Sequence, residues 1–270
     1  MKRKTITGLV LALALACLPV TQAVAQKAED RSQNYFQVLF DTTFSKEKDF
    51  RTGFGYSVFV QYEGKRLLFD LGADAATLEH NIKTAGIDPA TLDAVAVSHN
   101  HFDHMSGLTY IRKVRPDLDV FVPPGQDFDD GKLIPLGDTA SITPNLTLLR
   151  THTETPTVGI ADEISVLIRT AQGPYLITAC SHTSVATIVD KAMKLANAEI
   201  FHYTGGARLK FRGVEDAKKV VGDLKARKVK HVSPGHCSVD HNVGQVFEEA
   251  FTTDYSASRL GRKVMLTPPG

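Results

Sequence analysis

The sequence contains no tryptophan, only three cysteines in 270 residues, and almost no excess of charge of either sign. Three cysteines are too few for a fold that disulfides hold together. A formal net charge of +1 gives no reason to expect nucleic acid or another polyanion as a partner. Because 43% of the residues are hydrophobic and 23% are charged, the chain can bury a core, and disorder of the whole chain is excluded.

The first 25 residues have the pattern of a secretory signal peptide. Residues 2–4 are basic, residues 8–20 are apolar, and small residues lead up to a predicted cleavage after Ala25. A membrane anchor is one alternative, which the short apolar run and Pro19 disfavour, and lipoprotein processing at Cys17 is another. No other stretch is apolar enough to span a membrane, so we predict a periplasmic or secreted protein with no stable membrane insertion.

The remaining residues, 26–270, are predicted to form a single α/β domain. Strands are predicted at residues 35–40, 56–62, 65–70, 92–98, 164–170, 175–179, 199–203 and 229–233. Helices are predicted at residues 74–85, 106–114, 184–196, 214–228 and 242–251. Residues 123–160 are rich in Pro, Gly, Asp and Thr and are predicted to be mainly loops. Hairpins precede strand–helix units in each half, which predicts a four-layer αββα sandwich of two mixed β-sheets with helices on the outer faces.

Three histidines and one aspartate lie within six residues, directly after a strongly apolar stretch. On an extended backbone His99 and His101 point to the same side, because they are two residues apart. Asp103 and His104 follow where the chain turns toward a helix, so they can face a second position. Imidazole and carboxylate groups are preferred zinc ligands, and imidazole also binds iron. The pattern predicts two metal ions close enough to share a bridging hydroxide.

Two later strands also end in residues that can bind metals. The apolar run 176–179 leads into Cys180-Ser181-His182, and a run that ends at Ser233 leads toward His236-Cys237. We expect these strand ends to complete the metal sites, since the four ligands of the first cluster cannot complete two of them. Cys180 and Cys237 leave two alternatives open: Cys180 binds metal, or the two cysteines form a disulfide.

A further acidic residue, Asp70, ends the apolar run Leu67-Leu68-Phe69. A carboxylate at the end of a buried strand is costly unless it is paired or hydrogen-bonded. We expect Asp70 to orient the histidine segment, with helix capping or turn formation as the alternative.

Together these motifs resemble the metallo-β-lactamase superfamily. Phe69-Asp70-Leu71-Gly72 followed by His99-Asn100-His101-Phe102-Asp103-His104 carries the resemblance. Within the superfamily the chain is similar to the dihydropterin–ribofuranosylaminobenzene phosphate synthases, over about residues 35–265. The stretches that match this group are Thr52–Ser57, Leu68–Gly72, Ser98–Leu108, Ala179–His182, Gly205-Gly206 and His236-Cys237. The resemblance implies an αββα sandwich with the metals in the cleft between the sheets.

The resemblance also implies a role for each matching residue. His99, His101 and His182 would bind the first metal, and Asp103, His104 and His236 would bind the second. Cys180 falls where many relatives place an aspartate that bridges the metals. His152 is the alternative third ligand of the first metal, because many members of the superfamily place a histidine ahead of this hairpin.

Arg208 stands where the group tends to carry a histidine. The group reads Gly-Gly-x-His-Leu, whereas this chain reads Gly205-Gly206-Ala207-Arg208-Leu209. An arginine cannot ligate a metal. If the missing histidine contacts substrate in the group, this chain acts on a different substrate, and Arg208 is expected to pair with a carboxylate or phosphate.

The expected chemistry is hydrolysis by a metal-activated water. Divalent cations lower the pKa of bound water toward neutrality and stabilise the anion that develops. Asp103 is the expected catalytic residue, because it can orient the nucleophile as well as bind metal. We expect two divalent ions, with zinc favoured and iron or manganese as alternatives. The expected substrate is a small ester, lactone or phosphoester.

A second hypothesis is a metal protein that does not hydrolyse its ligand. It would be an iron redox enzyme, an enzyme like the pterin synthases or a metal-dependent binding protein, with the soft sulfur of Cys180 near the metals. The synthase reaction uses intracellular metabolites, whereas a signal peptide would export this chain. We therefore expect the chain to share the fold and the metal site of the synthases rather than their reaction. A small molecule is the expected partner, and the sequence predicts no oligomeric state.

Overall fold

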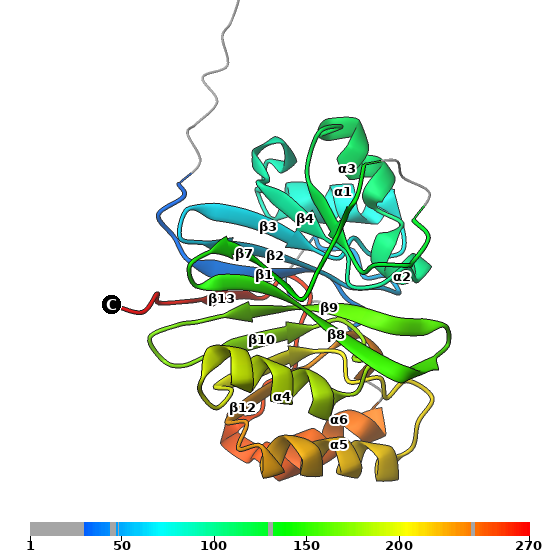
Figure 1. The fold of residues 1–270 in the computed structure, drawn as a ribbon, viewed down its shortest axis with the longest axis vertical. Coiled ribbons are helices and arrows are strands. Elements are labelled where there is room, and N and C mark those ends of the chain that lie inside the picture. The colour runs from blue at the N-terminus through cyan, green and yellow to red at the C-terminus, as the bar shows by residue number, and fades with distance from the viewer. Residues whose placement is uncertain (1–29, 44–46, 48, 129–131, 239–240) are drawn as a thin grey trace, which may run out of the picture. The chain divides into compact units, whose positions relative to one another are not determined.

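Two β-sheets lie between two layers of helices, which confirms the αββα sandwich that the sequence predicts (Figure 1). The computed structural model describes residues 30–43, 47, 49–128, 132–238 and 241–270. The predicted signal peptide lies outside these residues. No helix in the described part of the chain has the length and apolar character that a membrane span requires.

The first sheet has the strand order β13-β1-β2-β3-β4-β5-β6. Its strands are β1 (Tyr35–Phe40), β2 (Ser57–Tyr62), β3 (Lys65–Phe69), β4 (Ala94–Ala96), β5 (Val120–Val122), β6 (Ile134–Pro135) and β13 (Lys263–Met265). Strands β13, β1, β2 and β3 pair antiparallel, and β3 through β6 pair parallel. The predicted β2–β3 hairpin is confirmed. Its turn residues Glu63 and Gly64 have φ of 49° and 74°, and a type I′ turn needs a positive φ at both positions.

The second sheet has the strand order β12-β11-β10-β9-β8-β7. Its strands are β7 (Thr139–Thr143), β8 (Leu146–Thr157), β9 (Ile160–Ile168), β10 (Tyr175–Thr178), β11 (His202–Gly205) and β12 (His231–Pro234). Strands β7 through β10 pair antiparallel, which confirms the second predicted hairpin, and β10, β11 and β12 pair parallel.

Helices cover the outer face of each sheet (Figure 1). The helices are α1 (Ala75–Thr84), α2 (Phe102–Met105), α3 (Leu108–Val114), α4 (Val185–Ala196), α5 (Val214–Ala226) and α6 (His241–Phe251). Helices α1 and α3 pack on the first sheet, and α4, α5 and α6 pack on the second. The Asp74 side chain accepts a hydrogen bond from the Thr77 backbone N–H and so begins α1, as the sequence predicts.

Three apolar layers follow from the alternation of side chains along the strands. Val58 and Val60 of β2 face the second sheet and pack in the layer between the sheets. Phe59 lies between them in sequence and packs in the outer layer with Leu78 and Ile111 of the helices. A separate layer holds α4, α5 and α6 against the second sheet. Both sheets are therefore buried on their two faces.

The prediction that residues 123–160 are mainly loops is wrong. Strands β6, β7 and β8 lie in this segment, and β9 begins at Ile160. Strand β7 is at the edge of its sheet, so polar Thr and Ser side chains point outward and the sequence carries no apolar run. The second half of β8 is largely exposed and pairs only with β9. Because these strands are largely exposed, their sequences lack the apolar pattern that predicts a strand, although their backbone pairing is regular.

Other predicted boundaries also change. The predicted helix at residues 106–114 begins at Leu108, as α3, and a separate short helix, α2, precedes it at Phe102–Met105. The predicted strand at 92–98 shortens to β4. The predicted strand at residues 199–203 shifts to β11 at His202–Gly205. Gly107 lies between the two short helices, where an added Cβ would come within 2.3 Å of the Leu71 carbonyl oxygen. This close approach allows α2 to sit directly over the end of β3.

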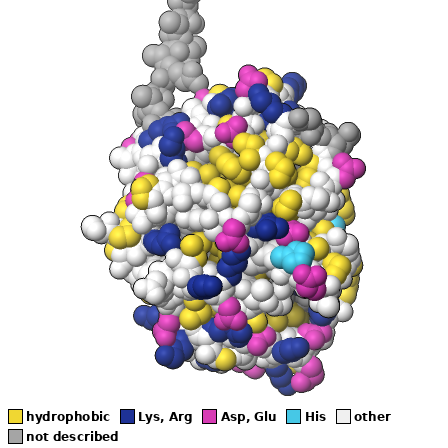
Figure 2. All heavy atoms as spheres, in the orientation of Figure 1, with side chains coloured by type: hydrophobic (Ala, Val, Ile, Leu, Met, Phe, Trp, Pro, Cys, Tyr) yellow, Lys and Arg dark blue, Asp and Glu magenta, His cyan; other side chains and the backbone are white. Residues whose placement is uncertain are grey.

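Basic and acidic side chains are interspersed over the face in Figure 2, most densely over α4 and α5. This mixed surface agrees with a chain of 31 basic and 30 acidic residues. The face in Figure 2 therefore shows no large area covered by charge of a single sign.

Candidate metal centre

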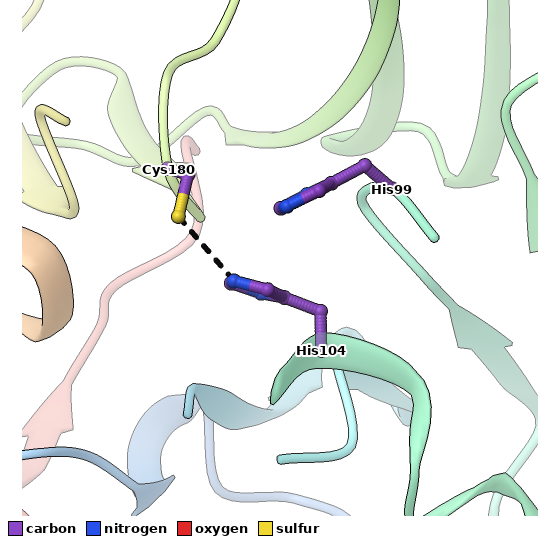
Figure 3. A group of neighbouring side chains, drawn as sticks. All are labelled: His99, His104 and Cys180. Atoms are coloured by element: carbon purple, nitrogen blue, oxygen red, sulfur yellow. Dashed lines mark hydrogen bonds between the residues drawn. The ribbon is translucent and has the colours of Figure 1, made fainter. Parts of the chain in front are cut away.

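The candidate site lies where strands of both sheets end. Asp70 follows β3 and His99 follows β4, and these strands run parallel in the first sheet. Cys180 follows β10 and His236 follows β12, within the parallel part of the second sheet. The carboxyl ends of parallel strands meet at one edge of a sheet, so each sheet brings its polar residues to one edge. Figure 3 shows His99 after β4, His104 on α2 and Cys180 after β10 approaching one another.

One group of histidines has three ring nitrogens close together. His99, His101 and His182 offer ligand atoms that all lie within 4.8 Å of one another. His99 Nε2 is 3.0 Å from His101 Nδ1, and the His182 ring centroid is 4.6 Å from that of His99. The structure thus brings His182 to the two histidines that follow β4.

A second group joins a carboxylate to two histidines. Asp103 Oδ2 is 3.5 Å from His104 Nε2 and 3.4 Å from His236 Nε2, and the ligand atoms of all three lie within 4.8 Å. Cys180 Sγ is 3.3 Å from His104 Nε2. The ligand atoms of His99, His104 and Cys180 also lie within 4.8 Å of one another. The two groups are therefore adjacent, with Cys180 beside both.

Asp70 fixes the histidines of both groups. Its carboxylate accepts hydrogen bonds from the Ser98 backbone N–H at 2.6 Å and the Ser98 hydroxyl at 2.9 Å, and it lies 2.7 Å from His104 Nδ1. His104 Nδ1 therefore donates a hydrogen bond to Asp70, and Nε2 is the ring nitrogen that faces Cys180 and Asp103. The Ser98 hydroxyl donates to Asp70, so it accepts from His99 Nδ1 at 2.9 Å and leaves His99 Nε2 unprotonated.

His101 has the opposite orientation. Its Nε2 lies 3.3 Å from the backbone oxygen of Val158, in the turn between β8 and β9, and donates its proton there. His101 Nδ1 is then unprotonated and faces the unprotonated Nε2 of His99. Two lone pairs that face each other at hydrogen-bond distance repel, unless a cation lies between them.

The second group carries charge of both signs. Burial acts to raise the pKa of Asp103, but contacts with His104 and His236 outweigh burial and hold that pKa well below its ordinary value. Burial acts to lower the pKa of His104, but the charges of Asp70 and Asp103 raise it to about 10. A cation at Nε2 of His104 would replace that proton, because imidazole binds metal in its neutral form.

The histidines of the first group are held neutral. Burial lowers the pKa of His99 well below its ordinary value, and the neighbouring histidines lower it further. Burial, followed by the charges of His101 and Arg208, lowers the pKa of His182 to about 3. Neutral imidazoles are the form that ligates a metal.

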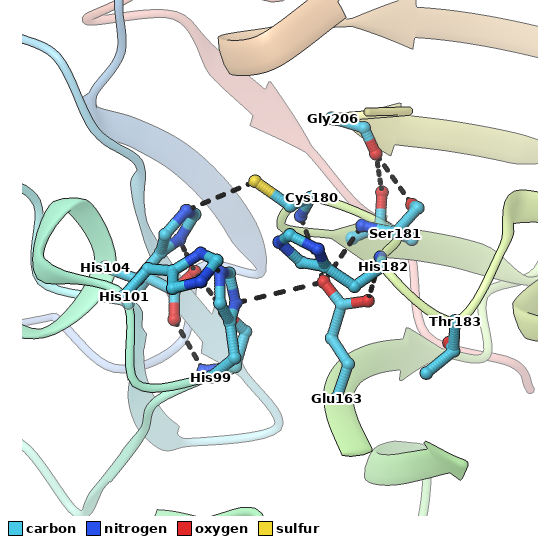
Figure 4. Close-up of polar contacts among 12 residues, drawn as sticks. His99, His101, His104, Glu163, Cys180, Ser181, His182, Thr183 and Gly206 are labelled. Carbon is cyan, nitrogen blue, oxygen red and sulfur yellow. Dashed lines mark hydrogen bonds and ion pairs between the residues drawn. The ribbon is translucent and has the colours of Figure 1, made fainter. Parts of the chain in front are cut away.

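Two buried carboxylates that the sequence analysis did not select hold the other segments of the site. Glu163 of β9 accepts hydrogen bonds from the backbone N–H groups of Cys180 at 3.1 Å, Ser181 at 2.9 Å and His182 at 2.6 Å (Figure 4). Asp41 accepts from the backbone N–H of His236 at 3.1 Å. The sequence signal was available in each case, because Glu163 interrupts an apolar strand and Asp41 directly follows one.

The two cysteines are both buried and both free. Cys237 Sγ lies 3.9 Å from the backbone oxygen of Cys180 and accepts a hydrogen bond from the Arg208 backbone N–H at 3.3 Å. Gly205 and Gly206 let this part of the chain pass close to the end of β10. An added Cβ would lie 1.9 Å from the Thr178 oxygen at Gly205, and 2.1 Å from the Ala179 oxygen at Gly206.

His152 lies apart from the clustered histidines. Its side chain is 47% exposed, and its ring nitrogens lie 3.2 Å from carboxylate oxygens of Glu154 and Asp162. The interaction with Asp162, followed by that with Glu154, raises the pKa of His152. Of the two residues considered for the third position, His182 is therefore the one that the fold brings to His99 and His101.

Apolar side chains border the cluster. Phe102 is 61% exposed and Val158 is 68% exposed, although both adjoin His101. The ring centroid of Phe54 lies 5.9 Å from that of Phe102 and 5.7 Å from that of His236. The histidine cluster thus has a partly apolar rim.

Known proteins share this arrangement of the chain. The family model described as the metallo-beta-lactamase superfamily matches residues 50–236, which is more than half of the chain and includes every residue of the two groups. The chain belongs to the metallo-beta-lactamase superfamily. The resemblance inferred from the sequence motifs is therefore confirmed.

Relatives of this metallo-beta-lactamase-fold chain include enzymes of more than one kind. A 7,8-dihydropterin-6-methyl-4-(beta-D-ribofuranosyl)-aminobenzene-5'-phosphate synthase from Methanocaldococcus jannaschii is 25% identical over 263 residues, covering 78% of this chain and 88% of the relative. Tm1679, a metal-dependent hydrolase of the beta-lactamase superfamily, is 24% identical with a TM-score of 0.73, covering 87% of this chain and 99% of that one. YhfI from Bacillus subtilis is 16% identical with a TM-score of 0.57, covering 86% and 98%. These two structures share the fold.

A metallo-beta-lactamase fold implies a divalent metal site, and the donor set in this chain fits one. Both ring nitrogens of His182 and Nε2 of His236 are buried, and none of them has a hydrogen-bond partner within the described residues. A buried polar atom without a partner is costly, and a cation would satisfy it. Imidazole, carboxylate and thiolate are all zinc ligands. The residues present therefore fit a divalent cation.

Proposed function

We propose that this chain is a metal-dependent hydrolase with two divalent ions, with zinc favoured, bound side by side. The ligands would be His99, His101 and His182 for the first ion and Asp103, His104 and His236 for the second, with Cys180 beside both. The observation that carries the proposal is the convergence of buried ring nitrogens that have no hydrogen-bond partner, at His182 and His236.

Bound divalent ions supply a Lewis acid and lower the pKa of water toward neutrality. Asp103 stays ionised because its pKa is held low, so its carboxylate can accept a hydrogen bond from the attacking water and orient it. The water oxygen bonds to the carbonyl carbon or phosphorus of the substrate, and the bond to the leaving oxygen breaks. The proton that the water gives up ends on the departing oxygen.

The proposed substrate is a small ester, lactone or phosphoester. Phe102 and Val158 offer apolar contact beside the histidines, which suits a substrate with an apolar portion next to its reacting bond. The superfamily and the metal-dependent hydrolase of the same fold support a hydrolase.

A second candidate is a metal enzyme that does not hydrolyse its substrate, such as an iron redox enzyme or an enzyme like the pterin synthases. The position of Cys180 favours it, because a thiol 3.3 Å from His104 Nε2 offers a soft ligand that changes metal preference. The 25% identity with a synthase also supports it.

The test combines metal analysis with a panel of lactones, phosphodiesters, phosphomonoesters and β-lactams. Purified protein should hold about two divalent ions per chain and turn over at least one class. His101→Ala should abolish that turnover, while His231→Ala, which changes a histidine at the opposite end of β12, should keep it. Wild-type turnover in His101→Ala would refute the proposal, and a coloured iron protein without turnover would favour the second candidate.

We also propose that the chain is exported and cleaved after Ala25, on the strength of the basic, apolar and small-residue pattern of residues 1–25. Mass spectrometry of the protein from the extracytoplasmic fraction should then find Gln26 at the N-terminus. An intact N-terminus on protein recovered from the cytoplasm would contradict export.

A further inference from the structure

A cavity of about 300 Å³ adjoins the histidine cluster on the side of the second sheet. It shares His182 with the cluster, and Ser181 and Arg208 also line it. The end of β8, the N-terminal turn of α4 and the α5 region form its walls. A volume of this size is at the lower end of the range for small-molecule sites.

Basic side chains outnumber acidic ones in the cavity. Its charged lining residues are Arg208, Arg212, Lys219, Asp216 and Asp223. Within the residues that the structure describes, neither Arg208 nor Arg212 forms an ion pair with a carboxylate. The negative charge of Asp223 is partly balanced by Arg227, which does not line the cavity. A guanidinium nitrogen of Arg227 lies 3.6 Å from the Asp223 carboxylate.

Arg208 and Arg212 line the same cavity and carry like charges. Burial lowers the pKa of Arg208, and the charge of Arg212 lowers it further. Arg208 lines the same cavity as His182, which is a proposed ligand of the first metal ion. A fixed positive charge beside a proposed cation site is unfavourable by itself, and an anion between the two would offset the repulsion.

Arg208 is held in place from the cluster side. Its guanidinium donates a hydrogen bond to the Thr157 hydroxyl, which lies 3.3 Å from the backbone oxygen of His182 and donates to it. Its backbone has a φ of 54°, a left-handed conformation that costs a residue other than glycine about 1–3 kcal/mol. The arginine is therefore positioned rather than free on the surface.

Hydroxyl side chains also line the cavity, at Thr153, Thr155, Thr157, Ser181, Thr183 and Ser184. Two of them already donate their protons to backbone oxygens, Thr157 to His182 and Ser181 to Gly206. Ser184 is also the N-cap of α4, so the positive end of that helix dipole points toward the same space. Guanidinium donors beside a helix N-terminus form an environment that suits an oxyanion.

We propose that this cavity binds an oxyanion group of the substrate, a phosphate or a carboxylate, through Arg208 and Arg212. The reacting bond then lies at the histidine cluster, and His182 is the contact between the two halves of the site. The assignment of the anion to a substrate rests on the proposed hydrolase, whereas the affinity of the cavity for an anion does not require turnover.

Anion binding is tested first, by isothermal titration of the metal-loaded protein with inorganic phosphate and, separately, with acetate. Arg212 is exposed, so Arg212→Gln should fold normally, and it should weaken binding of the preferred anion about tenfold or more. Arg208→Gln should have an effect at least as large. Arg259→Gln is the matched control, because Arg259 is an exposed arginine that lines a different cavity.

Comparing the two anions shows which group the cavity recognises. A preference for inorganic phosphate indicates a phosphate group of the substrate, and a preference for acetate indicates a carboxylate. Repeating the titration on His101→Ala, which should lack the first metal ion, separates cavity binding from binding to the metals. Loss of binding in Arg212→Gln but not in Arg259→Gln supports the proposal. Absence of binding in the wild type, or wild-type affinity in both Arg208→Gln and Arg212→Gln, overturns it.

Turnover is tested second, with matched neutral and anionic esters. Arg212→Gln should raise KM for the anionic ester about tenfold more than KM for the neutral ester, whereas Arg259→Gln should change neither. A protein that binds the anion through Arg212 but hydrolyses nothing would refute the hydrolase and keep the anion site. If the protein hydrolyses esters but Arg212→Gln changes neither anion binding nor KM, the anion site is refuted and the hydrolase is kept.

Discussion

Replacement of Asp70 by Asn should weaken binding of the second metal ion while the protein stays folded. Asn is nearly isosteric with Asp, and it tolerates the left-handed backbone of residue 70, which has a φ of 59°. The amide oxygen can still accept from the Ser98 backbone N–H. The amide nitrogen then occupies the position that faces the Ser98 hydroxyl and His104 Nδ1.

The change reverses the proton on His104. An amide N–H that faces His104 Nδ1 can only donate, so Nδ1 must accept and the ring proton moves to Nε2. His104 Nε2 is the atom that faces Asp103 and Cys180, and a protonated nitrogen cannot ligate a metal. Substitutions that disturb the partner of a metal-binding histidine typically cost about 10- to 100-fold in metal affinity. That range corresponds to about 1.4–2.8 kcal/mol.

A loss of stability accompanies this effect and must be separated from it. Hydrogen bonds to a charged group contribute about 1.5–3 kcal/mol each, so the uncharged amide should lower the free energy of unfolding by a similar amount. Asp93→Asn provides the control. Its carboxylate also accepts a backbone N–H, from Arg66 at 2.9 Å, and pairs with Arg31 at 2.8 Å, but it precedes β4 and lies at the opposite end of that strand.

The assay is a titration against a chromophoric chelator that gives the Kd of each metal ion, with urea unfolding of the metal-free proteins alongside. Asp70→Asn should weaken one of the two Kd values, and Asp93→Asn should weaken neither although it lowers stability. If Asp70→Asn binds both ions with wild-type affinity, the tautomer argument is wrong and Asp70 serves stability alone.

Two further predictions concern histidines inside and outside the cluster. His182→Ala should lose about one metal ion per chain by elemental analysis while His152→Ala keeps both, and the opposite result would make His152 the ligand. His202 lies outside the cluster, and burial, then the charges of His231 and Arg262, lower its pKa to about 3. Its unfolded pKa is near 6.5, so the unfolded chain takes up the proton first and stability falls as the pH drops below 6.5. Between pH 7 and pH 5 this residue should account for about 2 kcal/mol of the fall in unfolding free energy. Urea unfolding at the two pH values measures that fall. If His202→Gln loses as much unfolding free energy as the wild type over this range, the prediction is wrong.

The positions of the histidines could be predicted because strand ends follow from simple patterns. A buried parallel strand is a short apolar run, and the residues that follow β4, β10 and β12 lie at the carboxyl ends of such runs. The sequence alone could not decide between His152 and His182. That choice depends on β8, whose exposed second half carries His152 outward, and this half was predicted to be loop.

The carboxylates that hold the site were harder to predict, because their partners are backbone N–H groups far away in sequence. Glu163 lies 17 to 19 residues before the amides that it binds, and Asp41 lies 195 residues before that of His236. No local spacing encodes such contacts. A buried acidic residue in an apolar strand still indicates that some partner exists, and Asp70 was selected on that ground.

Each segment that carries candidate ligands is held by one buried carboxylate on a neighbouring element. Asp70 binds the Ser98 amide, Glu163 binds the three amides from Cys180 to His182, and Asp41 binds the amide of His236. Two of these segments contain a residue in the left-handed region, Ser181 with φ of 61° and His236 with φ of 49°.

A left-handed conformation costs about 1–3 kcal/mol at a residue other than glycine, so something other than local preference must hold it. The three acidic side chains can do so, because a hydrogen bond to a backbone amide is strong where both groups are buried. These bonds involve no ligand atom, so they persist whether or not a cation is bound. The segments are therefore ordered before metal binding, and little conformational entropy remains to be lost when a cation enters.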